Sequence, residues 1–252
     1  MKLLSRSASR AVISFCIPAH NEERLLPATL VAINNAAREL SVDFEIVVAN
    51  DSSTDGTTQA ALAGGARIVQ IDSRQIAAAR NAAARAACGD ILFFIDADTR
   101  IHTSAVAQAL ALLESGCVGG GAVPRFDGHG PLWANLLLGC LLIPYRMASF
   151  AAGAFMFCTR EAFERSGGFD ERLFAGEEVS FAIALKRVGR FRLIRDRVLT
   201  SGRKVRAYSM REVIGTVGRA MLKGPRAVTS RDGLEMWYGP RRPDPDNKEI
   251  SK

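Results

Sequence analysis

An α/β fold with a mostly parallel sheet flanked by helices is predicted by two features of this sequence. Over the first hundred residues, short apolar runs alternate with segments of helical spacing, which is typical of a doubly wound sheet. The run 91–95 is apolar throughout, as expected of a strand covered on both faces. The length of 252 residues, 48% of them hydrophobic, is enough for one sizeable domain of this class.

The alternation divides the first hundred residues into four strands and three helices. The apolar runs predict strands at 12–17, 44–48, 67–71 and 91–95. A first helix is expected over about 22–40, because Leu26, Leu30, Ile33 and Leu40 recur at helical spacing. A short helix is expected between Gly56 and the Gly64-Gly65 pair, and an alanine-rich one over 76–87.

Beyond residue 100 the pattern changes. A helix is expected from 103 to about 113, followed by apolar, hairpin-like segments at 118–126 and 150–158. Another helix is predicted over 177–188, with Phe181, Leu185 and Val188 facing inward and Gly189 as its C-cap. The composition further predicts a flexible leader over 1–10, a basic helical extension over 206–238 and a disordered tail over 239–252.

The cysteines and the apolar stretches bear on the cellular compartment. The five cysteines form an odd set without C-x-x-C spacing, and several lie in apolar runs, so we interpret them as small buried hydrophobes in a reducing compartment. The stretch 132–145 has 14 residues, whereas a spanning helix needs about 20. The N-terminal residues 1–10 include basic residues but no apolar stretch of signal-peptide length. A cytoplasmic protein is therefore predicted, either soluble or peripheral at the inner face of a membrane.

The net charge of +7 is unevenly distributed. Between Lys186 and Arg231 there are 14 Lys or Arg residues and only two acids, Asp196 and Glu212. This segment predicts an anionic partner such as a nucleotide diphosphate, a lipid phosphate or an anionic membrane surface. A nucleic acid is not expected, because the segment lacks interleaved aromatic residues and any nucleic-acid-binding motif. The alternative interpretation is a solvated face that serves solubility.

Two carboxylates stand directly after the apolar run 91–95. Asp96 and Asp98 are separated only by the small Ala97, and ligands of parallel sheets bind beyond the carboxyl ends of the strands. Such a pair suits a hard divalent cation that takes its remaining ligands from water and a substrate diphosphate. The alternative is that Asp98 caps the following helix and that Asp96 is merely solvated.

The other strand ends carry polar motifs in a fixed order. They are PAHNEE at 18–23, ANDSSTDGT at 49–57, ARN at 79–81, DAD at 96–98, GGFDE at 167–171, GEEVSF at 176–181 and TSGRK at 200–204. In this order and spacing the chain resembles the family 2 glycosyltransferases over about residues 12–204. The resemblance implies a GT-A fold with a Rossmann-like sheet, a donor half over about 11–100 and an acceptor half over about 101–205.

The resemblance implies a nucleotide-diphosphate-sugar donor bound across the first half of the sheet. Pro18, Ala19, Asn21 and Glu22 match the family's first loop, which lies along the nucleotide, with Glu22 placed to hold ribose hydroxyls. Asp51 matches the acidic residue that reads the base or the ribose.

The resemblance also assigns the diphosphate and the metal. Arg80 matches the helix residue near the diphosphate, where a guanidinium suits phosphate oxygens. Asp96 and Asp98 match the pair that binds Mg²⁺ or Mn²⁺. Arg203 and Lys204 match, more loosely, a basic element that closes over the donor phosphates.

The general base is also implied by the resemblance. Glu178 matches the carboxylate that acts as base in inverting members, with Glu177 beside it, and the alternative is that both are ordinary first-turn acids. The sequence departs from the family where Asn50 replaces a usual aspartate and where Glu178 replaces the more frequent Asp. Asn50 bears on which nucleotide is preferred.

The function predicted at this stage is an inverting, metal-dependent glycosyltransferase that uses a hydroxyl or lipid-linked acceptor. The alternative is a catalytically silent sugar-nucleotide-binding or scaffold protein on the same fold. A nicotinamide-dependent oxidoreductase is excluded, because the first strand is followed by Pro18-Ala19-His20-Asn21 rather than G-x-G-x-x-G.

Overall fold

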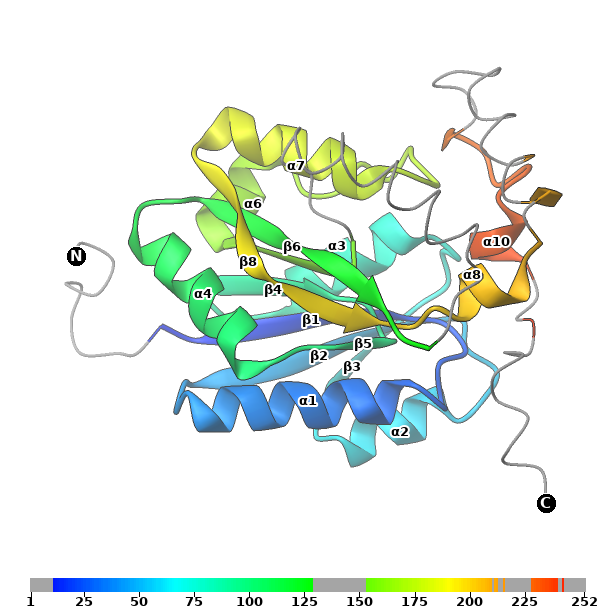
Figure 1. The fold of residues 1–252 in the computed structure, drawn as a ribbon, viewed down its shortest axis with the longest axis horizontal. Coiled ribbons are helices and arrows are strands. Elements are labelled where there is room, and N and C mark those ends of the chain that lie inside the picture. Colours follow the sequence, from blue (N-terminus) through cyan, green and yellow to red (C-terminus); the bar gives the residue numbers. More distant parts are fainter. Residues whose placement is uncertain are drawn as a thin grey trace.

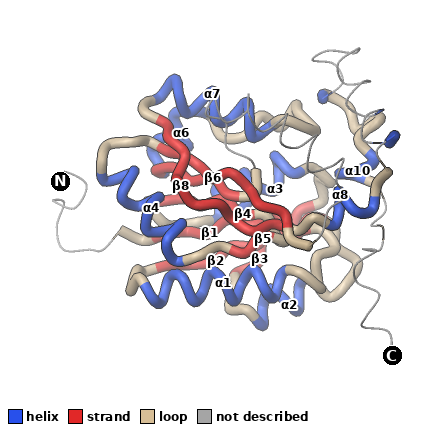
Figure 2. Tube along the Cα trace, in the orientation of Figure 1, coloured by secondary structure: helices blue, strands red, loops and turns tan. Residues whose placement is uncertain are grey.

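One curled sheet forms the centre of the molecule, with helices on both of its faces (Figures 1 and 2). The structure is a computed structural model and describes residues 11–128, 153–209, 211, 212, 215, 228–239 and 242. Within these residues the sheet has eight strands in the order β3-β2-β1-β4-β7-β6-β8-β5.

The strands and helices alternate along the first hundred residues, as predicted. The strands are β1 (Ile13–Ala19), β2 (Phe44–Asp51), β3 (Arg67–Ile71), β4 (Ile91–Ile95), β5 (Thr99–Arg100), β6 (Gly119–Phe126), β7 (Phe155–Thr159) and β8 (Phe191–Thr200). The helices are α1 (Leu26–Glu39), α2 (Thr57–Ala63), α3 (Ile76–Ala86), α4 (Thr103–Glu114), α6 (Arg160–Ser166), α7 (Glu177–Val188), α8 (Arg203–Ala207) and α10 (Glu235–Tyr238).

The predicted bounds differ from the observed ones mainly next to the strand ends. The first helix begins at Leu26 rather than near Glu22, because the main-chain N–H groups of Leu25 and Leu26 donate to the Glu22 carbonyl in a preceding turn. Pro27 then lies in the first turn of α1, where its missing N–H costs nothing. Strand β2 continues beyond the predicted 48 to Asp51, because it pairs with both β1 and β3 as far as the loop.

The sheet is parallel in its first half and mixed in its second. Strands β1, β2, β3 and β4 pair in parallel, and β6 pairs in parallel with β8. Strand β7 is antiparallel to both β4 and β6, and β5 is antiparallel to β8. The parallel half brings the carboxyl ends of β1, β2 and β4 to one edge, where the predicted ligand-binding loops lie.

Both faces of the sheet are buried, in two clusters. Alternate residues of β1 point to opposite faces, so Phe15 and Ile17 pack with α1 and α4 whereas Cys16 packs with α3 and α7. The central strand β4 is buried on both sides, with Phe93 in one cluster and Phe94 in the other. This confirms the fully covered strand that its apolar run predicted.

Glycine permits close strand packing in β6. A Cβ on Gly120 would collide with the Arg192 carbonyl oxygen and the Phe157 ring. Gly189 ends α7, as predicted, in an extended conformation. Its hydrogen side chain matters for space, because a Cβ there would lie 2.5 Å from Val118 Cγ1.

Several predictions fall partly or wholly outside the described residues. These are the leader 1–10, nearly all of the tail 239–252 and the apolar stretch 132–145.

Cys16, Cys117 and Cys158 are buried as predicted, whereas Cys88 is exposed. None of the helices that the structure describes has the length and apolar character needed to cross a membrane.

Candidate active site

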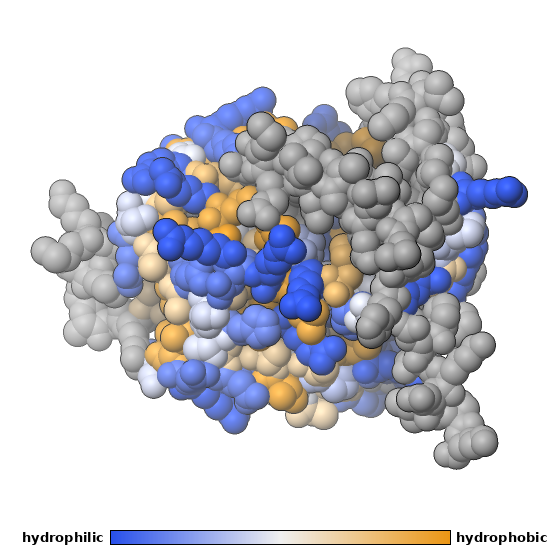
Figure 3. Space-filling view, viewed as in Figure 1, coloured by the Kyte–Doolittle hydropathy of each residue, from blue (hydrophilic) through white to orange (hydrophobic). Residues whose placement is uncertain are grey.

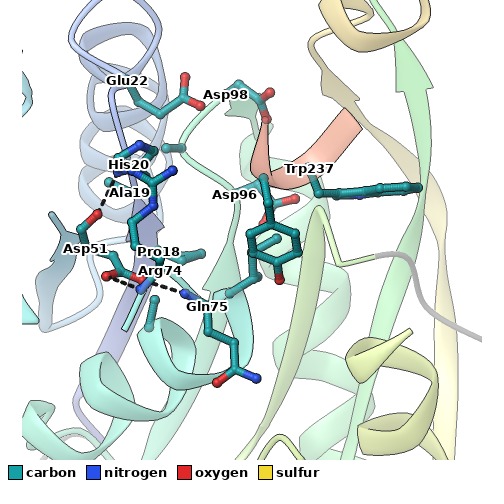
Figure 4. A pocket seen from close by; sticks show the side chains of 14 residues that line it. Pro18, Ala19, His20, Glu22, Asp51, Arg74, Gln75, Asp96, Asp98 and Trp237 are labelled. Atoms are coloured by element: carbon teal, nitrogen blue, oxygen red, sulfur yellow. Dashed lines mark hydrogen bonds between the residues drawn. The ribbon is translucent and has the colours of Figure 1, made fainter. Parts of the chain in front are cut away.

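A cavity opens at the carboxyl ends of β1, β2 and β4 (Figure 4). The space between its lining residues is about 680 Å³, which includes space open to solvent. Its lining residues come from the three strand ends, from the start of α3 and from α10: Pro18, Ala19, His20, Glu22, Asp51, Arg74, Gln75, Ile76, Ala79, Asp96, Ala97, Asp98, Trp237 and Tyr238. Six residues singled out in the sequence therefore meet here, whereas Asn21, Arg80, Glu178 and Arg203 do not line the cavity.

Asp51 fixes the shape of one side of the cavity. Its Oδ1 accepts from the main-chain N–H groups of Ser73 and Arg74 at 2.9 and 2.7 Å, and its Oδ2 accepts from that of Gln75 at 2.8 Å. Gln75 is the N-cap residue of α3. The Asp51 carboxylate thus anchors the loop that leads into α3 as well as facing the cavity.

The first loop is held against the second by side-chain to main-chain hydrogen bonds. Asn21 adopts a left-handed conformation, with φ of 52°. Its Oδ1 accepts from the Thr54 N–H at 2.8 Å, and its own N–H donates to Ser53 Oγ at 2.9 Å. His20 donates from Nδ1 to the Asp51 carbonyl at 2.6 Å. Asn21 therefore shapes the site by joining the two loops.

Arg80 lies behind the cavity and joins two carboxylates that are far apart in the sequence. Its Nη2 donates to Asp96 Oδ1 at 2.8 Å, and its Nη1 donates to Glu177 Oε1 at 2.7 Å. The Arg80 side chain is 3% exposed and the Glu177 side chain 6%, whereas that of Asp96 is 34% exposed. A Cβ on Gly153 would collide with the guanidinium, so glycine leaves room for this link.

Asp98 and Glu22 face each other across a second arginine. Arg203, the first residue of α8, donates from Nη2 to both carboxylate oxygens of Glu22, at 3.0 and 3.3 Å. The same nitrogen is 4.0 Å from Asp98 Oδ2, and Asp98 Oδ1 accepts from Thr200 Oγ1 at 3.3 Å. The link ties the end of β8 to the loop after β1.

The paired glutamates begin α7, next to the Arg80 link. Gly176 precedes them in a left-handed conformation, and two acids in the first turn of a helix are favoured by its dipole. Burial and the neighbouring charge of Glu177 raise the pKa of Glu178 to about 8, against the opposing effect of Arg80. The two carboxylates therefore differ in their chemistry. Glu177 forms an ion pair with Arg80, whereas Glu178 has a pKa suited to proton transfer near neutral pH.

The two aspartates after β4 fit a divalent cation that is shared with a substrate. Among the described residues, no group of three or more His, Cys, Asp or Glu residues could hold a metal ion by itself. Asp96 and Asp98 both line the cavity, and their side chains are 34% and 15% exposed. Two carboxylates with open positions are what Mg²⁺ or Mn²⁺ needs when phosphate oxygens and water complete its shell.

Sequence reasoning missed the aromatic side of the cavity. Trp237 and Tyr238 come from α10, within the segment predicted only as a basic helical extension. An available signal was the pair of large aromatic residues inside a polar stretch. Such residues are enriched at binding surfaces, where one end of the ring stays wet.

Solved structures of glycosyltransferases share this fold. A mannosyltransferase from Pyrobaculum calidifontis, in complex with GDP-Man and Mn²⁺, matches with a TM-score of 0.64 and 22% identity over 92% of this chain and 70% of its own. A glucosyl-3-phosphoglycerate synthase from Mycobacterium tuberculosis, in complex with Mn²⁺ and uridine-diphosphate-glucose, matches with a TM-score of 0.56 and 20% identity, covering 92% of this chain and 80% of its own. The fold is the GT-A fold of glycosyltransferases.

The sequence comparison narrows this class to one family. The model of glycosyl transferase family 2 matches residues 14–197. The chain belongs to this family.

Curated relatives match this chain over only part of their length. An undecaprenyl-phosphate 4-deoxy-4-formamido-L-arabinose transferase from Aeromonas hydrophila is 34% identical over 94 residues, which are 34% of this chain and 29% of that protein. An uncharacterized glycosyltransferase from Bacillus subtilis is 35% identical over 107 residues, which are 40% of this chain and 27% of that protein. The matches thus span less than a third of either relative.

Proposed function

We propose that this chain transfers a sugar from a nucleotide-diphosphate-sugar to an acceptor, with inversion at the anomeric carbon and with Mg²⁺ or Mn²⁺. The observation that carries the proposal is the meeting of Asp96 and Asp98 with Glu22 and Asp51 in one cavity. Complexes of structural neighbours with Mn²⁺ and GDP-Man or UDP-Glc support a donor and a cation of this kind.

The residues on this edge of the sheet have separate roles in the proposal. Pro18, Ala19 and Glu22 line the nucleotide, with Glu22 on the ribose hydroxyls, and Asp51 faces the base or ribose while it holds the α3 loop. Asp96 and Asp98 hold the cation. When bound, the cation stabilises the diphosphate as a leaving group.

The two arginines act from behind these carboxylates. Arg80 orients Asp96 through its 2.8 Å hydrogen bond. Arg203 is placed between Glu22 and Asp98, so a small rotation of its side chain brings the guanidinium toward the donor phosphates. A guanidinium can contact two phosphate oxygens at once.

Glu178 is proposed as the general base that takes the proton of the acceptor hydroxyl. The structure supports it over Glu177, because the Glu177 carboxylate is engaged by Arg80 at 2.7 Å. With a pKa raised to about 8, Glu178 becomes a competent base as the pH approaches that value. The pH–rate profile of kcat should therefore rise toward about 8 and lose this limb in Glu178→Gln, while Glu177→Gln keeps the limb.

The acceptor is proposed to be a hydroxyl or lipid-linked group presented at an anionic membrane surface on the cytoplasmic side. The name of the Aeromonas relative, an undecaprenyl-phosphate transferase, supports a lipid-linked acceptor. Strand β8 adds exposed Arg192, Arg195 and Arg197. Figure 3 shows hydrophilic side chains gathered over the region of β6 and β8, with apolar surface between them.

The test of the donor site is thermal unfolding with GDP and UDP, each with and without Mn²⁺. A ligand at 100 times its Kd stabilises the folded chain by about 2.7 kcal/mol, which shifts the midpoint measurably. We expect a shift that requires both the nucleotide and the metal. A complete lack of shift would contradict the donor site.

The matched variants are Asp98→Ala and Asp90→Ala. Asp90 is exposed at the opposite end of β4, away from the cavity. Asp98→Ala should fold normally and lose the metal-dependent shift and metal-stimulated turnover, whereas Asp90→Ala should retain both. A shift without any turnover of GDP-mannose, UDP-glucose or UDP-GlcNAc would favour the silent, sugar-nucleotide-binding alternative.

A further inference from the structure

The segment 228–239 is anchored across the outer edge of the cavity. The Phe174 N–H donates to the Val228 carbonyl at 2.6 Å, and Arg231 Nη2 donates to the Ser73 carbonyl at 2.6 Å. We call residues 228–239 the strap. It reaches from the loop before α7 to the loop before α3, the same loop that Asp51 holds.

Arg231 fixes the strap through its ring contacts as well. Its guanidinium lies 5.3 Å from the ring centre of Phe174 and 5.8 Å from that of Tyr238. The two rings pack edge to face with their centres 5.7 Å apart. Tyr208 adds a hydrogen bond of 3.0 Å from its hydroxyl to the Glu235 carbonyl. The end of the strap is therefore preorganised.

This anchoring presents two aromatic side chains to the cavity. The Tyr238 hydroxyl is buried beside Ile76, the first residue of α3. It makes no hydrogen bond to a residue that the structure describes. Trp237 lines the cavity and is 38% exposed. In Figure 4 its ring lies on the side of Asp96, across the cavity from Asp51 and His20.

Trp237 differs from a side chain that only packs the fold. The large side chains of the two core clusters are nearly all fully buried, and Trp237 has no ring contact with another aromatic residue among those described. The partly exposed indole on the Asp96 side of the cavity offers a flat apolar surface close to a carboxylate. A ligand with one apolar and one polar side matches this combination.

We propose that the strap completes the active site and that Trp237 is a stacking surface for a pyranose ring. The assignment rests on the proposed function. The C–H face of a pyranose is apolar while its hydroxyl groups are polar, so it can cover the indole and still reach Asp96 and the water around it. The position across from Asp51 places this ring at the sugar end of the donor rather than at its base.

Two sources of the pyranose ring remain, the donor's own sugar and a sugar unit of the acceptor. The first test compares Kd values for GDP with GDP-mannose, and for UDP with UDP-glucose, in the presence of Mn²⁺. Trp237→Ala should leave the Kd of the nucleotide diphosphates unchanged. If the donor's sugar stacks on Trp237, the Kd of the sugar nucleotide rises about tenfold, which corresponds to about 1.4 kcal/mol.

The second test addresses the acceptor. The chain has two tryptophans, so Trp133→Phe leaves Trp237 as the sole source of indole fluorescence. Methyl α-mannoside and methyl β-glucoside are titrated into this variant with GDP or UDP and Mn²⁺ present. A saturable fluorescence change that the sugar-free nucleotide complex lacks assigns the stacking surface to the acceptor.

Two further variants of Trp237 test whether an aromatic ring is required at this position. Trp237→Phe retains an aromatic face and should keep a Kd for the sugar nucleotide close to that of the wild-type chain. Trp237→Leu retains only apolar volume and should raise this Kd as Trp237→Ala does. Leu62→Ala removes another exposed apolar side chain, 60% exposed on α2, and should change neither titration.

The outcomes separate this inference from the function on which it rests. If the wild-type chain binds the nucleotide diphosphates, but Trp237→Ala does not alter sugar-nucleotide binding and the glycosides cause no saturable fluorescence change in Trp133→Phe, the stacking assignment is wrong and the proposed function stands. If the wild-type chain binds no nucleotide at all, the proposed function is contradicted first.

Discussion

Replacing Arg80 by methionine should destabilise the fold far more than the same change at Arg85 on the same helix. Arg80 is 3% exposed and joins Asp96 to Glu177 through hydrogen bonds of 2.8 and 2.7 Å. Arg85 pairs with Glu171 at 3.0 Å, but the two side chains are 67% and 42% exposed. The two arginines therefore make similar ion pairs at very different depths.

The expected magnitude follows from what each substitution leaves behind. Removing one partner of a buried ion pair costs about 3–5 kcal/mol, because the remaining charge is buried without compensation. Glu177, 6% exposed, meets this condition, whereas Asp96, 34% exposed, can be hydrated. We therefore expect the lower end, about 3 kcal/mol. An exposed pair such as that of Arg85 contributes about 0–1 kcal/mol.

Urea unfolding followed by circular dichroism measures both changes. At an m-value of about 3 kcal/mol/M, Arg80→Met should lower the midpoint by about 1 M, and Arg85→Met should lower it by a few tenths at most. Adding Glu177→Gln to Arg80→Met should recover part of the loss, because the uncompensated charge is then absent. Equal losses for the two arginines, or no recovery in the double variant, would refute the buried-pair reasoning.

Three further predictions concern pH, packing and surface charge. Because its pKa rises to about 8 in the folded chain, Glu178 binds its proton more tightly there than when unfolded, so the free energy of unfolding should fall between about pH 4.5 and 8. Glu178→Gln should flatten that decline in thermal unfolding measured from pH 5 to 9. Gly120→Ala should lower the free energy of unfolding by about 1–3 kcal/mol through overpacking. Gly215→Ala should change it little in the same urea assay, because no atom lies within 4 Å of the new Cβ. Binding to anionic liposomes should weaken with salt and fall at least about tenfold when Arg192 and Arg195 are both changed to Glu; sedimentation showing no binding at low salt would contradict the membrane proposal.

The parts of the site that could be predicted from the sequence are those carried by strand ends. Parallel strands bring their carboxyl ends to one edge, so a correct strand order brings Glu22, Asp51, Asp96 and Asp98 together without knowledge of any side-chain contact. Local apolar runs located the strand ends, and the resemblance to the family 2 glycosyltransferases assigned Glu22 and Asp51 to the site. The periodicity of these runs gave β3 and β4 with their observed bounds.

The parts that could not be predicted depend on contacts between distant segments. Arg80 and Glu177 are 97 positions apart, and nothing local to either residue indicates that they pair. The family resemblance predicts that Arg80 lies near the diphosphate, but its hydrogen bonds to Asp96 and Glu177 were not indicated by the sequence. Trp237 was missed for the same reason, since its place in the cavity depends on the anchoring of the strap by Arg231.

The charges around the cavity lead to a last prediction, on metal removal. Within the described part of the chain, carboxylates outnumber guanidinium groups there: Glu22, Asp51, Asp96, Asp98 and Glu177 against Arg74, Arg80 and Arg203. Of these arginines, Arg80 is shared by two carboxylates and Arg203 is engaged by Glu22. A nucleotide diphosphate adds further negative charge to a cavity that already has an excess of carboxylates. The repulsion between these like charges opposes binding unless a cation compensates them.

Removal of divalent cations with EDTA should therefore weaken binding of GDP or UDP by at least about tenfold, or about 1.4 kcal/mol. Binding of guanosine or uridine, which carry no phosphate, should stay the same, because the cation compensates charge at the diphosphate and not at the base. Isothermal titration with each pair of ligands distinguishes the two effects. Equal loss for nucleoside and diphosphate would show that the cation maintains the fold of the loops, whereas undiminished diphosphate binding in EDTA would remove the reason for assigning a metal to Asp96 and Asp98.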